Sequence, residues 1–194
     1  MKNIIIKNLC KSYGGRKVLD NFSAEIRLGE VVCIMGPSGC GKTTLLNILM
    51  GFEKADSGSI CGVPALKSAV FQEDRLCEEF SAAANIRLAT GKSADENIIK
   101  EHLKELGLDP DEKKPVKEFS GGMKRRIAII RAVLFHSDIL FLDEPFKGLD
   151  NETKKKVIDY VLSNAKGRTI IAVTHEQEEY KLLKGRLIEI PMLG

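Results

Sequence analysis

The sequence has little of what marks a membrane or secreted chain. Its longest apolar run is the five residues Val31–Met35, far short of the roughly 20 that a membrane-spanning helix needs. The N-terminal apolar stretch, residues 4–6, is also shorter than the hydrophobic region of a signal peptide, which has about 7 to 15 residues. We therefore expect a protein that stays in the cytosol.

The chain also has neither a large net charge nor closely spaced pairs of cysteines. Thirty basic and 27 acidic residues leave a net charge of +3, which gives no electrostatic reason to expect nucleic acid as a partner. The five cysteines are scattered without a C-x-x-C pair, so neither a zinc site nor a disulfide framework is indicated. With 194 residues, 43% of them hydrophobic, the chain can bury a core without metals or crosslinks.

Short β-branched runs alternate with helical patterns, which is the rhythm of a parallel sheet with helices on its faces. The expected strands are residues 4–6, 31–35, 69–71, 139–142, 169–173 and 187–190. The expected helices are residues 43–50, 94–106, 121–135, 152–164 and 176–184. Residues 22–28 alternate apolar and polar side chains, which predicts a strand with one solvated face. The expected fold class is α/β.

The middle of the chain, residues 73–118, is rich in charge, carries helical periodicity and lacks a convincing strand. We interpret it as a helical lobe inserted into a single domain that spans residues 1–194. The core of that domain then comprises residues 1–72 and 119–194. The lobe ends in DPDEKKPVKEF, whose two prolines and many charges are typical of an exposed connector.

A phosphate-binding pattern follows the apolar run Val31–Met35. The segment GPSGCGKTT has the form G-x-x-x-x-G-K-[ST] and leads into a helical pattern, which is the strand, loop and helix context that a P-loop requires. Backbone N–H groups and the helix N-terminus would hold phosphates, Lys42 would reach the β- and γ-phosphates, and Thr43 would offer a hydroxyl to Mg²⁺. The loop residues expected to bind nucleotide are Gly36, Ser38, Gly39, Cys40, Gly41, Lys42, Thr43 and Thr44.

Cys40 lies inside this loop, where amides and Lys42 should favour its thiolate. The location predicts a thiol that reacts with alkylating agents but has no catalytic role.

A second pattern, SDILFLDEP, is an apolar run that ends in two carboxylates. Ligands of open α/β sheets bind at the carboxyl ends of the strands, so these carboxylates should lie beside the phosphate-binding loop. We expect Asp143 to hold Mg²⁺ and Glu144 to accept a proton from an attacking water.

A third pattern, Ser120-Gly121-Gly122, stands immediately before a helix with Met123, Ile127 and Ile130 on one stripe. Ser120 suits the N-cap position, and the two glycines let an anion approach the helix end. On its own this tripeptide is most often an ordinary helix cap.

Together these patterns resemble the nucleotide-binding subunit of ABC transporters over nearly the whole chain. The matching elements, in the family's order, are Tyr13 for the adenine-stacking aromatic, GPSGCGKTT for the Walker A loop, Gln72 in VFQED for the Q-loop, FSGGM for the signature, ILFLDE for Walker B, GLD at residues 148–150 for the D-loop, and His175 in VTHE for the switch histidine. The resemblance implies a P-loop NTPase core with a mainly parallel sheet flanked by helices, and a small antiparallel β lobe.

The resemblance also implies a mechanism with ATP and Mg²⁺ as cofactors. Two subunits pack head to tail, so that Ser120, Gly121 and Gly122 of one clamp the γ-phosphate of an ATP bound by the other. Hydrolysis then loosens the pair. By resemblance, Glu144 is the general base, Gln72 senses magnesium and water, His175 positions water and the γ-phosphate, Lys42 contacts phosphate, and Asp150 lies at the dimer seam.

The partners implied are a second ATPase subunit, identical or paralogous, and integral membrane permease subunits that dock near Glu73 to Phe80. The protein would then be peripheral at the cytoplasmic face of the membrane. No nucleic acid is expected. VFQEDR together with SGGM looks most like importers of the nitrate, sulfonate and taurine type.

Two departures from the family pattern stand out. Met123 replaces a glutamine common in the signature and cannot donate a hydrogen bond to nucleotide. Residues 51–71 are fewer than usual, so the antiparallel lobe is expected to be trimmed.

Two alternatives use the same phosphate-binding loop. A nucleotide kinase would need an arginine-bearing lid and has no use for SGG before a helix. A soluble ABC-type ATPase that clamps nucleic acid or a ribosome would carry long insertions or two tandem cassettes, and its surface would be more basic.

Overall fold

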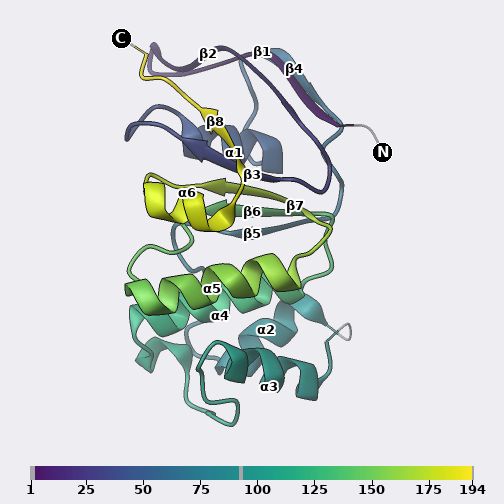
Figure 1. Cartoon of the computed structure of the whole chain (residues 1–194), viewed down its shortest axis with the longest axis vertical. Coiled ribbons are helices and arrows are strands. Elements are labelled where there is room, and N and C mark those ends of the chain that lie inside the picture. The colour runs from purple at the N-terminus through teal and green to yellow at the C-terminus, as the bar shows by residue number, and fades with distance from the viewer. Residues whose placement is uncertain (1–2, 92–93, 194) are drawn as a thin grey trace.

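The computed structural model describes residues 3–91 and 94–193, which form a parallel and an antiparallel sheet with helices packed around them (Figure 1). The strand order of the parallel sheet is β5-β6-β7-β3-β8, and each neighbouring pair runs parallel. Its strands are β5 (Lys67–Val70), β6 (Ile139–Asp143), β7 (Thr169–Val173), β3 (Val31–Met35) and β8 (Arg186–Glu189). The parallel sheet confirms the α/β fold class.

The central strands are apolar throughout because both faces of the parallel sheet are covered. Successive side chains point to opposite faces, so Ile139 and Phe141 of β6 enter one core while Leu140 and Leu142 enter the other. All four are fully buried, and each contributes about 1.5 to 3 kcal/mol by leaving water.

One face of the parallel sheet is covered by α1 (Lys42–Met50) and by the antiparallel sheet, which lies at the top of Figure 1. The antiparallel order is β2-β1-β4, with bounds β2 (Arg16–Ile26), β1 (Ile4–Tyr13) and β4 (Ser57–Cys61). The apolar side chains of β2 face inward and its polar ones outward, which confirms the predicted half-solvated strand.

The other face is covered by helices, and α2 and α3 lie farthest from the sheet, at the bottom of Figure 1. The bounds are α2 (Ala82–Thr90), α3 (Glu96–Glu105), η1 (Val116–Glu118), α4 (Gly121–Leu134), α5 (Asn151–Asn164) and α6 (Gln177–Leu183). Buried Ile86 and Ile99 belong to the same core as Leu140, so α2 and α3 share a core with the sheet. The division into residues 1–72 with 119–194 and an inserted 73–118 stays a prediction. None of the described helices is long and apolar enough to cross a bilayer.

The expected bounds of 31–35 and 169–173 match β3 and β7, while other bounds were wrong. β5 begins and ends earlier than the expected 69–71, and β1 runs on beyond residue 6 to Tyr13 because it pairs with both β2 and β4. β4 and α2 were not expected as separate elements: β4 is a mostly exposed strand without an apolar run.

The charged sequence of α3 suggests an exposed surface for His102, but the structure shows this residue to be half-buried. Its side chain is 17% exposed, and its Nδ1 lies 2.8 Å from the hydroxyl of Tyr160 on α5. The charged sequence around His102 hides this contact, because it is made with a residue 58 positions away.

Candidate functional site

The phosphate-binding loop connects β3 to α1, at the carboxyl edge of the parallel sheet. Gly41 precedes α1 with φ of 98°, and a Cβ at this position would lie 2.4 Å from the carbonyl oxygen of Val18. A Cβ at Gly36 would lie 2.3 Å from the carbonyl oxygen of Ile190. Only glycine fits at these two positions, so the loop owes its shape to close backbone approach as well as to left-handed geometry.

Lys42 opens α1 and lies folded back over the loop. Its Nζ donates hydrogen bonds of 2.8 Å to the carbonyl oxygens of both Gly36 and Pro37, and the residue is only 8% exposed. An ammonium group bound to neutral carbonyls rather than a carboxylate keeps its full positive charge available to an anion. The arrangement therefore suits a phosphate placed in the same loop.

Cys40 does not have the accessibility that the sequence predicted. Its side chain is 2% exposed and belongs to the apolar core beneath the loop, with its Sγ 3.9 Å from Lys42 Nζ. The expectation of ready alkylation was wrong, because the loop turns this thiol toward the core.

A cavity of about 300 Å³ lies against the loop and brings most of the expected nucleotide residues together. It is lined by Tyr13, Val18, Ser38, Gly39, Gly41, Lys42, Thr43, Thr44, Gln72 and Glu144. Tyr13, at the end of β1 and the rim of the cavity, is 47% exposed, and Lys11 Nζ lies over its ring at 5.1 Å from the centroid. The cavity joins segments that are as much as 131 positions apart in the sequence, between Tyr13 and Glu144.

Asp143 ends β6 beneath this cavity. It is 6% exposed, and Thr43 Oγ1 donates a hydrogen bond of 3.3 Å to its Oδ1. Burial raises the pKa of Asp143, the negative charge of Glu144 raises it further, and the hydrogen bond from Thr43 opposes both. A desolvated carboxylate beside a hydroxyl is a donor set that a hard divalent cation would stabilise.

The described residues contain no cluster of three or more His, Cys, Asp or Glu side chains that could hold a metal. Mg²⁺ commonly takes one or two protein oxygens and completes its shell with phosphate and water. Thr43 and Asp143 fit that requirement.

Glu144 follows β6 in a left-handed backbone conformation, with φ of 46°, and its N–H donates to the carbonyl oxygen of Val173. Its Oε1 lies 3.5 Å from Nδ1 of His175, a residue that follows β7 and is 54% exposed in its side chain. Its Oε2 lies 3.2 Å from Nζ of Lys147. The expected base and switch histidine are thus neighbours, and Lys147 is a further contact that no sequence motif indicated.

The signature residues lie elsewhere. Ser120 caps α4, accepting a hydrogen bond of 3.3 Å from the N–H of Met123. Ser120 and Gly121 are exposed, and neither Gly121 nor Gly122 has the positive φ that would require glycine. A Cβ at Gly121 would meet no atom within 4 Å. Nothing in the described part of the subunit itself therefore explains these glycines.

Asp150 caps α5 beside the signature. Its carboxylate accepts hydrogen bonds from the N–H and the hydroxyl of Thr153, at 2.9 and 2.6 Å, and these bonds lower the pKa of Asp150. Leu149, its neighbour, would contact a Cβ at Gly122 at 3.5 Å. The site residues thus form two groups: one around the loop cavity, and one at the N-termini of α4 and α5.

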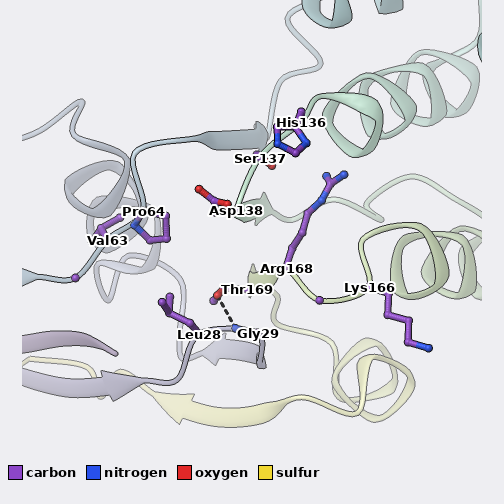
Figure 2. A pocket seen from close by; sticks show the side chains of 12 residues that line it. Leu28, Gly29, Val63, Pro64, His136, Ser137, Asp138, Lys166, Arg168 and Thr169 are labelled. Carbon is purple, nitrogen blue, oxygen red and sulfur yellow. Dashed lines mark hydrogen bonds between the residues drawn. The ribbon is translucent and has the colours of Figure 1, made fainter. Parts of the chain in front are cut away.

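A larger hollow of about 840 Å³ lies at the opposite edge of the sheet, where the loops before β3, β6 and β7 meet (Figure 2). Figure 2 shows Leu28, Val63 and Pro64 facing Asp138 and Thr169, with Thr169 accepting a hydrogen bond from Gly29. None of the expected site residues lines this hollow. Residue chemistry, rather than size, therefore distinguishes the candidate nucleotide site.

Comparison with known proteins identifies the family. The sequence model of the ABC transporter family matches residues 19–147. The chain is 36% identical over 180 residues to the aliphatic sulfonates import ATP-binding protein SsuB 2 of Pseudomonas syringae pv. tomato, covering 92% of this chain and 78% of that protein.

Two further relatives have similar coverage. The chain is 35% identical to the taurine import ATP-binding protein TauB of Jannaschia sp., over 97% of this chain and 77% of the relative. It is 34% identical to the bicarbonate transport ATP-binding protein CmpD of Synechococcus elongatus, over 95% of this chain and 74% of the relative.

Proposed function

The chain belongs to the ABC transporter family as an ATP-binding and ATP-hydrolysing subunit, and from that premise we propose which of its residues do the work. The observation that carries the assignment is the cavity that joins the phosphate-binding loop to Gln72 and Glu144. Lys42 and the loop amides bind the phosphates of ATP, while Tyr13 stacks on the adenine.

The chemical step is placed at the ends of β6 and β7. Thr43 and Asp143, with Gln72, hold Mg²⁺, which when bound neutralises phosphate charge and fixes the geometry of the triphosphate. Glu144 accepts the proton of the attacking water. His175, 3.5 Å from Glu144, orients that water and the γ-phosphate.

We propose that hydrolysis takes place between two subunits, either identical or paralogous. The support is the placement of Ser120 and Gly121, which are exposed, and of Gly122, which is partly exposed; all three lie outside the cavity. A helix N-terminus with exposed glycines binds an anion through its free N–H groups. The anion it fits is the γ-phosphate of an ATP on the facing subunit, with Asp150 beside the same seam.

The membrane partners are proposed to dock near Glu73 to Phe80, on the cytoplasmic side. Most residues of this stretch are exposed. Phe80 is 46% exposed, and a large exposed apolar side chain is a feature of protein–protein contact surfaces. Because the relatives named above are import or transport subunits for sulfonates, taurine and bicarbonate, we propose that this chain serves import, with the solute selected by the permease.

A mixing experiment tests the shared sites. A subunit with Ser120→Arg keeps an intact phosphate-binding loop but cannot complete the ATP site of its partner. A subunit with Lys42→Ala has a defective phosphate-binding loop but keeps the signature that completes the site of its partner. Each variant alone should be inactive, and an equimolar mixture should regain up to about a quarter of the wild-type ATPase rate, since half the pairs then hold one complete site. A mixture no more active than either variant alone would contradict the shared arrangement.

A further inference from the structure

Gln72 sits on a loop that has no hydrogen-bonded secondary structure of its own. Residues 71–75 leave β5 and lead toward α2, and they form neither helix nor strand. Gln72 borders both the nucleotide cavity and a smaller hollow of about 180 Å³ that reaches Thr43 and Asp143. Something other than the loop's own backbone must therefore hold Gln72 at the site.

Arg125, on α4, is the side chain that holds it. Its Nη1 donates to the carbonyl oxygen of Phe71 at 2.6 Å, and its Nη2 donates to the carbonyl oxygen of Gln72 at 2.5 Å. Its Nε lies 3.1 Å from Oδ1 of Asp74. The planar guanidinium donates to both carbonyl groups from separate nitrogens while a third nitrogen faces Asp74, a fixed fork that the single nitrogen of an ammonium group does not provide.

Burial makes this contact energetically important. Arg125 is 7% exposed, and a buried charge is tolerated only when its donors are satisfied. Removing the guanidinium would leave two carbonyl groups without this donor and Asp74 without its closest cation. The loop would be expected to shift rather than remain with those groups unpaired.

A second arginine of α4 supports the far end of the loop. Arg131 donates from Nη2 to the carbonyl oxygen of Asp74 at 3.0 Å and from Nη1 to that of Arg75 at 2.8 Å. Two side chains of one helix thus engage four of the five carbonyl groups between residues 71 and 75.

The helix that provides these arginines begins at the signature. Ser120 caps α4, and Arg125 follows after little more than one turn. A displacement of the N-terminus of α4 would therefore move the carbonyl groups of Phe71 and Gln72 with it.

We propose that Arg125 is a positioning residue that acts through Gln72, tying this side chain to the helix that carries the signature. The inference rests on the proposed function, because it takes Gln72 to be needed for ATP turnover. It goes beyond that function by assigning a role to a residue outside every motif that defined the site.

Arg168 provides a matched control. It is partly buried before β7, and its Nη1 donates to the carbonyl oxygens of Val133 at 2.8 Å and of Phe135 at 3.2 Å, at the C-terminal end of α4. It makes carbonyl contacts of the same kind with the same helix region, but none with the loop that carries Gln72 or with the signature. Arg168→Met therefore removes comparable hydrogen bonds without releasing Gln72.

The test compares Arg125→Met, Arg125→Lys and Arg168→Met in the full chain. We measure the Kd for a fluorescent ATP analogue and kcat at saturating Mg²⁺ and ATP. Arg125→Met should lower kcat by about tenfold to 100-fold, as misplacement of a reacting geometry does, and change Kd by less than about threefold, because the phosphate-binding loop is untouched. Arg125→Lys should recover part of kcat, and Arg168→Met should stay close to wild type in both.

A double-mutant cycle with Gln72→Ala shows whether Arg125 acts through Gln72. If it does, Arg125→Met combined with Gln72→Ala should be no slower than Gln72→Ala alone. A double variant whose loss in kcat is the product of the two single losses would overturn the proposal. So would an Arg168→Met variant that loses as much kcat as Arg125→Met.

The remaining outcomes are also decisive. If Arg125→Met does not fold, the same cycle is run with Arg125→Lys, which keeps the charge, and an additive result again overturns the proposal. If Gln72→Ala alone turns over at the wild-type rate, then the function assigned to Gln72 fails and the inference fails with it. If Gln72→Ala lowers kcat and its loss is additive with that of Arg125→Met, the role proposed for Arg125 is wrong while the function assigned to Gln72 stands.

Discussion

At the scale of single residues, ATP binding in the proposed site depends on the charged side chains that contact the phosphates. Lys42→Ala should abolish ATP binding, because Lys42 carries the ammonium group proposed to bind the phosphates within the loop. Lys67→Ala is a matched control: Lys67 also donates to two backbone carbonyl oxygens, those of Leu49 and Met50, but at the far end of α1. Equilibrium binding of a fluorescent nucleotide should separate the two variants. Equal nucleotide affinity in the two variants would contradict the proposal that the loop binds the phosphates.

A second residue-scale prediction concerns the base. Glu144→Gln should keep ATP affinity and lower kcat by about 100-fold or more, because the amide cannot accept the proton of water. Glu152→Gln serves as the control, since Glu152 is an exposed carboxylate in the first turn of α5. Single-turnover hydrolysis measures the chemical step directly. Near-normal turnover in Glu144→Gln would mean that another group is the base.

At the scale of elements, two serine caps allow the structural and functional roles of Ser120 to be separated. Ser81 caps α2 and Ser120 caps α4, each accepting one hydrogen bond of 3.3 Å from a backbone N–H. Either serine to alanine should cost about 1 kcal/mol of stability. Only Ser120→Ala should also lower the ATPase rate, measured beside urea unfolding. Equal ATPase rates in the two variants would mean that Ser120 only caps α4 and has no part in ATP hydrolysis.

The contact between α3 and α5 predicts a pH dependence of stability. Burial lowers the pKa of His102, although the charges of Glu105 and Glu101 oppose this shift. The unfolded chain therefore takes up the proton at higher pH than the folded one, so stability should fall as pH drops below about 6.5.

His102→Gln should flatten that loss while keeping a polar partner for Tyr160. Melting temperatures between pH 5 and pH 8 check the prediction. His136→Gln is the control, because His136 is exposed beyond the end of α4. An unchanged pH profile in His102→Gln would exclude His102 as its source.

Local patterns made the elements around the site predictable. Val31–Met35 and the P-loop after it form a contiguous strand, loop and helix, so sequence spacing alone placed them. The sequence did not predict β4, because an exposed edge strand needs no apolar run. The contact of Arg125 with Phe71 joins residues 54 positions apart, and no pattern within one segment can predict such a contact.

At the scale of the whole molecule, the distribution of site residues is the main evidence. The loop cavity contains most of the residues proposed to bind and cleave a triphosphate, whereas Ser120, Gly121 and Asp150 are exposed at two helix N-termini. In the proposed arrangement, one subunit holds an incomplete site and, separately, the residues that complete the site of another. Family membership and this geometry support that proposal of a pair of subunits closed by ATP.

The most direct test of that claim is the mass of the hydrolysis-deficient protein in solution. Sedimentation velocity of Glu144→Gln with saturating ATP and Mg²⁺ should give a dimer, and the same protein without nucleotide, or carrying Lys42→Ala as well, should sediment as a single subunit. If Glu144→Gln saturated with ATP still sediments as a single subunit, also in the presence of its membrane subunits, the shared-site account is wrong.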